Sequence, residues 1–111
     1  MKSLLLASLL VLLVASTAHA DRTYAVRYRV VGAHFDVTYT NASGGTVQRS
    51  NINRRMEVTF RAPAGAFLYL SAQNNGEAGG VRCMIDVDGK RVVYAGSQGA
   101  YVISSCDYGT D

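Results

Sequence analysis

The sequence predicts a small all-β protein, an antiparallel β-sandwich of about seven short strands with one disulfide bond. Three observations lead to this prediction. After residue 20, apolar and polar residues alternate with a period of two, which is typical of half-buried strands. The same part of the chain has one proline and no apolar repeat of helical spacing. Its two cysteines, Cys83 and Cys106, form an even pair.

Residues 1–20 form an N-terminal segment that is typical of a signal peptide. Lys2 supplies a positive charge, 4–15 is an apolar run, and an A-x-A motif at 18–20 precedes Asp21. The apolar run of about 12 residues is shorter than the roughly 20 that a spanning helix needs. We therefore expect an exported protein, extracellular or in the cell envelope on the outer side of the cytoplasmic membrane. The alternative is an uncleaved anchor, and only then would the protein be membrane-associated.

The remaining residues, 21–111, are enough for one small domain. The whole chain has 11 Lys and Arg residues against 8 Asp and Glu residues, which is not the balance of a nucleic-acid-binding protein. The arginines are scattered through the sequence, apart from the pairs Arg54-Arg55 and Lys90-Arg91. This scatter favours a role in solubility over a polyanion site, and we expect no nucleic-acid partner.

Four strands are predicted in the first half of this domain. Their alternating segments are 24–30, 35–39, 46–50 and 56–60. The segment 41–45 contains two glycines and permits the positive φ angles of a tight turn. Its Asn41-Ala42-Ser43 also fits a glycosylation acceptor. Pro63 ends the fourth strand because proline has no N–H to donate to a sheet.

The second half contains an interior strand, a loop, a hairpin and a last strand. Residues 67–73 begin with apolar residues on both faces, as an interior strand does, and 74–80 are a flexible loop. Asp88-Gly89 favours a type I′ turn after the strand 81–87, because both turn positions need positive φ. The last strand, 100–106, then brings Cys106 back towards Cys83.

The two-residue turn predicts the register of its hairpin. Asp86 should oppose Arg91 as an outward charge pair, worth ~0.2–1 kcal/mol. Ile85 should oppose Val92, and Cys83 should oppose Tyr94. The residues expected on the inner face are Cys83, Ile85, Val87, Val92 and Tyr94. Because export permits oxidation, we expect Cys83 and Cys106 to form a disulfide.

The inventory of catalytic side chains is small, and we predict no enzyme, cofactor or metal. His34 is the only histidine after residue 20, and it lies on the polar face of a predicted strand. Paired cysteines cannot act as nucleophiles, and the chain has no G-x-S-x-G motif. Asp86 and Asp88 are followed by Gly89 and Lys90, which supply a turn and a positive charge where a calcium site needs oxygen ligands.

Several segments resemble one known family. They are 26–32, 37–41, 68–73, 81–90 and 99–101, followed by Cys106. In this order and spacing they resemble the extracytoplasmic domain of the MmpS family, the small mycobacterial membrane proteins of actinobacteria. The most specific part is the C-x-I-x-V-D-G-K block that begins at Cys83.

The resemblance implies an Ig-like β-sandwich over 21–111, with a Cys83–Cys106 bridge and no catalytic residues. It also implies an accessory role, in which the protein contacts a partner transporter of the MmpL or RND type. The chain departs from the family pattern in two ways. Family members typically carry an N-terminal transmembrane helix, whereas 1–20 here is typical of a cleavable segment. They often have a Pro-Trp pair where this chain has Asn53-Arg54-Arg55.

Two functions follow, both non-enzymatic. The first is an MmpS-like accessory protein that assists an envelope transporter, or contacts another envelope protein, by protein–protein contact. The second is a freely secreted binding module that holds a cell-envelope or extracellular ligand with loops such as 41–45 and 74–80. The candidate binding residues are Arg54, Arg55, Asn74, Asn75 and Tyr101.

Overall fold

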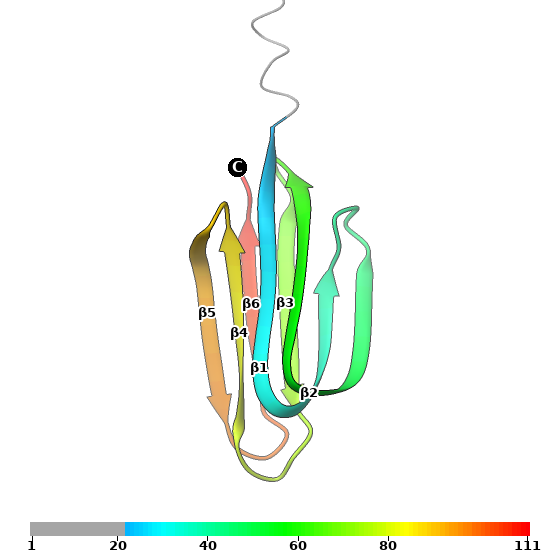
Figure 1. Cartoon of the computed structure of the whole chain (residues 1–111), viewed down its shortest axis with the longest axis vertical. Coiled ribbons are helices and arrows are strands. Elements are labelled where there is room, and N and C mark those ends of the chain that lie inside the picture. The colour runs from blue at the N-terminus through cyan, green and yellow to red at the C-terminus, as the bar shows by residue number, and fades with distance from the viewer. Residues whose placement is uncertain (1–21) are drawn as a thin grey trace, which may run out of the picture.

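The computed structural model describes residues 22–111, so the predicted signal peptide at 1–20 lies outside the described part. These residues form an all-β domain, as predicted, with six antiparallel strands (Figure 1). The strands are β1 (Thr23–Thr40), β2 (Thr46–Pro63), β3 (Phe67–Asn74), β4 (Gly80–Val87), β5 (Lys90–Gln98) and β6 (Ile103–Gly109). Within 22–111 there is no helix of the length and apolarity needed to cross a membrane.

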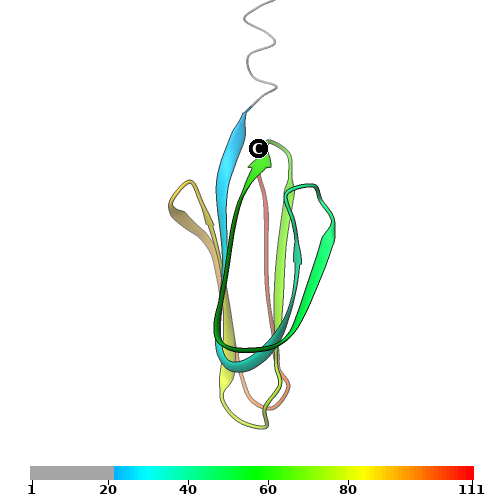
Figure 2. The same ribbon diagram turned by 45° about the vertical axis from the view of Figure 1, so that its right-hand side comes forward.

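β1 and β2 form a long hairpin that folds back on itself. The two strands pair almost throughout, from Thr23 opposite Pro63 to Thr40 opposite Thr46. Figures 1 and 2 show both strands curving round at the lower end of the view and running back. Register shifts near Gly32 and Phe35 mark the bend, since a bulge bends the strand that carries it.

About seven short strands were predicted, whereas residues 22–111 form six strands, two of them 18 residues long. The predicted breaks at 31–34 and 51–55 are bends inside continuous strands rather than loops between separate ones. In β2 the bend places Asn51 at φ 59° and Arg54 at φ 71°, angles that residues other than glycine rarely adopt.

The bend divides one antiparallel sheet into two facing parts. The sheet order is β5-β4-β1-β3-β6, with β2 beside β1. Residues 26–32 of β1 pair with β4, whereas residues 35–39 of β1 pair with β3. One part is thus β2-β1-β4-β5 and the other is β2-β1-β3-β6, and together they make a nearly closed sheet (Figure 2).

The core lies between these two parts. Its largest fully buried apolar side chains are Tyr28, Phe35, Leu68, Leu70, Ile85, Val30 and Val81. Tyr28 packs edge-on against Tyr39, with ring centroids 5.7 Å apart, and against Phe60 at 5.1 Å. Because Tyr28 and Tyr39 belong to the same strand, their contact shows that the two halves of β1 face each other across the core.

The predicted disulfide is confirmed. Cys83 of β4 and Cys106 of β6 are bonded and fully buried, with their Cα atoms 6.2 Å apart. Since β4 and β6 belong to different parts of the sheet, the bond joins the two parts across the core. The cysteines are 23 residues apart in sequence, so the crosslink should stabilise the fold by about 3 kcal/mol in the chain-entropy description.

The β4–β5 hairpin follows the predicted register only near its turn. Asp88 and Gly89 have positive φ angles, and Asp86 pairs with Arg91 as expected. A bulge beyond Asp86 then shifts the register, so Ile85 opposes Val93 and Cys83 opposes Ala95. The predicted pairs with Val92 and Tyr94 are therefore wrong. One extra residue in a strand turns the side chains that follow it to the opposite face of the sheet. Tyr94 accordingly faces outward and is 56% exposed.

Candidate functional site

The bend and two loops meet at one end of the domain, which we call the distal end. It comprises residues 31–36 of β1, 51–55 of β2, the β3–β4 loop at 75–79 and the β5–β6 loop at 99–102. Figure 1 shows it at the end opposite both the start of β1 and the C-terminus. The turn at 41–45 lies towards the other end, so the two loops suggested by the sequence do not form one site.

Asp36 fixes the β3–β4 loop to the bend. Its Oδ1 accepts a hydrogen bond from the backbone N–H of Asn51 at 2.9 Å and another from Asn75 Nδ2 at 2.8 Å. These two bonds favour the ionised carboxylate and hold the pKa of Asp36 below its ordinary value. The backbone N–H of Asn75 also donates to the carbonyl of His34 at 2.9 Å. The loop is therefore attached directly to β1, and Asp36 links it in turn to the bend of β2.

Asn74 joins the β3–β4 loop to the β5–β6 loop. The residue is 2% exposed, and its Nδ2 donates to the carbonyls of Ala78 at 3.1 Å and Gly99 at 2.9 Å. Its Oδ1 accepts from the N–H of Gly76 at 3.1 Å. With its amide fully used inside the protein, Asn74 positions the two loops instead of presenting a side chain to a ligand.

Tyr101 is the exposed aromatic residue of the distal end. Its side chain is 55% exposed, and its φ of 55° turns the β5–β6 loop. The backbone N–H of Tyr101 donates to the carbonyl of Gly76 at 3.2 Å, so the loop is held against 75–79. Arg54 and Arg55 lie in the bend of β2, opposite Gly32 and Val31 of β1, and both are exposed. Arg54, Arg55, Asn75 and Tyr101 therefore belong to this end, and Asn74 adjoins it as the last residue of β3.

A second surface covers the part β2-β1-β4-β5, and we call it the basic face. Alternate residues of each strand point outward, while their neighbours fill the core. The outward arginines are Arg27, Arg29, Arg55, Arg61, Arg82 and Arg91. The outward acidic residues of the same strands are Glu57 and Asp86. Six positive charges against two negative ones make this face strongly basic.

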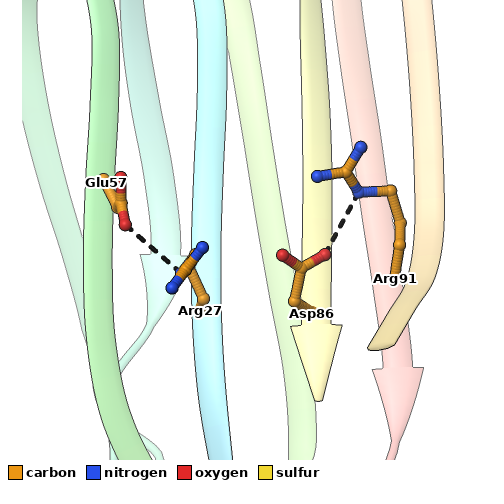
Figure 3. Close-up of polar contacts among 4 residues, drawn as sticks. All are labelled: Arg27, Glu57, Asp86 and Arg91. Carbon is orange, nitrogen blue, oxygen red and sulfur yellow. Dashed lines mark hydrogen bonds and ion pairs between the residues drawn. The ribbon is translucent and has the colours of Figure 1, made fainter. Parts of the chain in front are cut away.

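A ladder of alternating charges crosses the basic face. Figure 3 shows Glu57 of β2 beside Arg27 of β1, and Asp86 of β4 beside Arg91 of β5. The Arg27 Nε to Glu57 Oε1 distance is 3.2 Å, and the Arg91 Nε to Asp86 Oδ1 distance is 3.1 Å. The Asp86–Arg91 pair is the one predicted from the turn. Exposed pairs of this kind contribute about 0–1 kcal/mol each, so these two pairs add little to the stability of the fold.

Beyond the ladder, the basic face keeps uncompensated charge. Within residues 22–111, Arg29, Arg55 and Arg82 form no ion pair. Val31 of β1 lies opposite Arg55 of β2 on one side and opposite Arg82 of β4 on the other. The two arginines therefore lie in one row across three neighbouring strands. Arg29 is two residues from Val31 on the same outward side of β1.

Two grooves indent this face. The first, of about 450 Å³, is lined by residues that include Arg27, Phe60, Arg61 and Asp86. The second, of about 440 Å³, lies towards the distal end and is lined by residues that include Arg82, Tyr94 and Gly96. A side chain at Gly96 would meet Arg82 Cγ at 3.1 Å, so glycine lets the arginine stem lie on the β5 backbone. Each groove thus has an arginine in its wall.

The basic face was not foreseen, because its arginines are far apart in the sequence. The available signal was their position on the polar side of alternating segments, as at Arg27 and Arg29. Only the register between strands shows that these sides are contiguous. Within 22–111 the structure contains no group of three or more His, Cys, Asp or Glu side chains placed to hold a metal ion.

No protein-family model matches the chain, and no curated protein matches it. Function is therefore inferred from the distal end and the basic face.

Proposed function

We propose that this protein is an exported, non-enzymatic accessory domain whose distal end contacts a partner protein of the cell envelope. In the MmpS-like form of this proposal, the partner is a transporter of the MmpL or RND type. The observation that carries the proposal is the bracing of the distal end by Asp36 and Asn74, which leaves Arg54 and Tyr101 exposed beside the fixed loops.

A braced surface suits protein recognition for a physical reason. Ordering loops on binding costs free energy, and loops already held by hydrogen bonds avoid most of that cost. Tyrosine and arginine are also among the side chains that most often dominate binding energy at interfaces. Tyr101 belongs to the β5–β6 loop and Arg54 to the bend of β2, so a partner that covers the end would contact both.

The position of the distal end supports the same proposal. It is opposite the start of β1 (Figure 1), so an attachment before Arg22 would leave it accessible. The two facing parts of the sheet, joined by Cys83–Cys106, are compatible with the Ig-like sandwich that the MmpS resemblance implies. The family relationship, the fold type and the transporter partner are all part of this proposal.

A freely secreted binding module would use the same end, so the two functions differ in attachment and partner. Sequencing the mature N-terminus distinguishes them. A chain that begins at Asp21 favours the released module, whereas the intact N-terminus in the membrane fraction favours the accessory protein.

Affinity capture from membranes of the producing cell tests the proposed contact. The variant Arg54→Glu with Tyr101→Ala should lose most of a co-purifying RND-type transporter that the wild type retains. The control, Arg49→Glu with Phe67→Ala, makes the same charge reversal and also removes an exposed aromatic ring, at positions outside the distal end. Equal transporter recovery with both variants would reject the distal end as the contact.

A further inference from the structure

We propose that the basic face docks on an anionic phospholipid membrane. The proposal does not rest on the partner contact at the distal end, because it concerns the outward side of β2-β1-β4-β5. Arg55 is the one arginine that the two surfaces share. It assigns a ligand chemistry, the phosphate groups of an anionic lipid surface, to the four outward arginines that form no ion pair within 22–111: Arg29, Arg55, Arg61 and Arg82.

The uncompensated charge of the basic face is spread in two dimensions. Arg55, Arg29 and Arg82 lie on β2, β1 and β4, and adjacent strands are about 4.8 Å apart. Arg61 lies six residues beyond Arg55 on β2, which corresponds to about 20 Å along the strand. A flat anionic surface can meet all four guanidinium groups, whereas a linear polyanion would follow one row of them.

The side chains between the arginines also suit a lipid interface. Met84 of β4 lies opposite Tyr94 of β5 in the register, and Arg29 of β1 lies opposite Met84 on its other side. Tyr94 is exposed, with an apolar ring and a polar hydroxyl, the combination favoured at a boundary between water and lipid. The planar guanidinium groups can bind phosphate oxygens in a bidentate manner.

The charge of the domain is asymmetric, which would orient it on a membrane. The outward positions on the other part of the sheet hold mainly hydroxyl and amide side chains: Thr38, Thr40, Ser71, Gln73 and Ser105. That side also carries two acidic residues, Asp36 and Asp107, and one exposed arginine, Arg49. An anionic surface would therefore attract the basic face and leave the other side towards solvent.

Vesicle co-sedimentation tests this proposal with the protein as recovered after export. Vesicles of phosphatidylglycerol mixed with phosphatidylcholine are compared with vesicles of phosphatidylcholine alone, so any binding through a retained N-terminal segment appears in both. The expected result is an increment in binding to the anionic vesicles. This increment should vanish near 1 M salt, where charges are screened within about 3 Å.

The variant Arg29→Gln with Arg82→Gln should weaken this increment about 25-fold, at roughly fivefold for each arginine near an anionic membrane. Arg22→Gln with Arg49→Gln has the same net charge but leaves the basic face intact, and should retain the increment. Equal losses in both variants, or no preference for anionic vesicles, would overturn the proposal. Binding to heparin without binding to vesicles would also overturn it and would identify a soluble polyanion as the ligand.

Discussion

Cys83 of β4 and Cys106 of β6 form a buried disulfide that joins the two facing parts of the sheet. β4 and β6 do not pair in the sheet, and besides the disulfide a buried hydrogen bond from Ser104 Oγ to the carbonyl of Val81, at 2.8 Å, connects them. The crosslink therefore restricts the separation of the two parts in the unfolded chain as well as in the folded one.

Replacing both cysteines with alanine should lower the free energy of unfolding by about 3 kcal/mol or more, through lost loop closure and a small cavity. Urea denaturation of the double variant and of the oxidised wild type measures this difference. Reductant should destabilise the wild type and leave the double variant unchanged. A double variant as stable as the oxidised wild type would contradict the stated role of the disulfide.

The Tyr28 hydroxyl bridges the two halves of β1. It lies 2.8 Å from Thr40 Oγ1 and accepts a hydrogen bond from the N–H of Tyr69 at 3.3 Å, while burial raises its pKa. Tyr28→Phe should cost about 1 kcal/mol of stability, a moderate loss because Thr40 Oγ1 still accepts the Tyr69 N–H. Tyr94→Phe removes an exposed hydroxyl and should be neutral by the same urea measurement. Equal effects of the two substitutions would argue against the bridge.

Asp36 should make stability dependent on acid pH. Its hydrogen bonds with Asn51 and Asn75 lower its pKa in the folded state below the ordinary value of 3.8. The unfolded chain therefore binds this proton more readily, so stability is fully present above about pH 4 and is lost as pH falls through the folded pKa. Urea unfolding across this range should show that the free energy of unfolding falls less with decreasing pH in Asp36→Asn than in the wild type.

The control for this pH prediction is Asp107→Asn on β6. Asp107 is exposed, and its carboxylate accepts no hydrogen bond from other residues in 22–111. The Asp107→Asn variant should therefore lose as much stability at acid pH as the wild type does. An Asp36→Asn variant with the full wild-type acid loss would show that Asp36 does not fix the loop through its charged form.

Asn74→Ala should disrupt the distal end. It leaves the carbonyls of Ala78 and Gly99 without their buried donor, which should cost about 2–4 kcal/mol. Amide hydrogen exchange should also accelerate at Tyr101, because the β5–β6 loop loses the side-chain hydrogen bond from Asn74 to Gly99 and, of its bonds to residue 74, keeps only the backbone bond at Val102. The exposed Asn53→Ala serves as a control, since its side chain makes no hydrogen bond in the described residues. Unchanged exchange at Tyr101 in Asn74→Ala would show that Asn74 does not hold the loop.

Local patterns were enough to predict most of the fold. Alternation identified the strand segments, and Asp88-Gly89 identified a turn whose first pairs, including Asp86 with Arg91, are correct. The bulge that turns Tyr94 outward was not predictable, because no glycine or proline marks it. The bends of β1 and β2 were also missed, since the continuity of the strands depends on pairing such as that of Gly32 with Arg54, which lies 22 positions further along the chain.

The candidate site was predictable only in part. Arg54, Asn75 and Tyr101 were identified from loop and edge positions, and folding brings them to one end. The buried role of Asn74 was hidden, because an asparagine in a polar loop looks the same whether its amide faces solvent or other backbone groups. The basic face depends on the pairing of β1 with both β2 and β4, which no short segment encodes.

Site-specific photo-crosslinking tests the central claim, the partner contact at the distal end, most directly. A photoreactive phenylalanine at Tyr101, which is 55% exposed, is compared in producing cells with one at Phe67, which is 61% exposed. Phe67 begins β3 at the other end of the domain (Figure 1). The account predicts an adduct with an RND-type envelope transporter from position 101 and none from position 67. An adduct at position 67 alone, or no transporter adduct at either position, would contradict it.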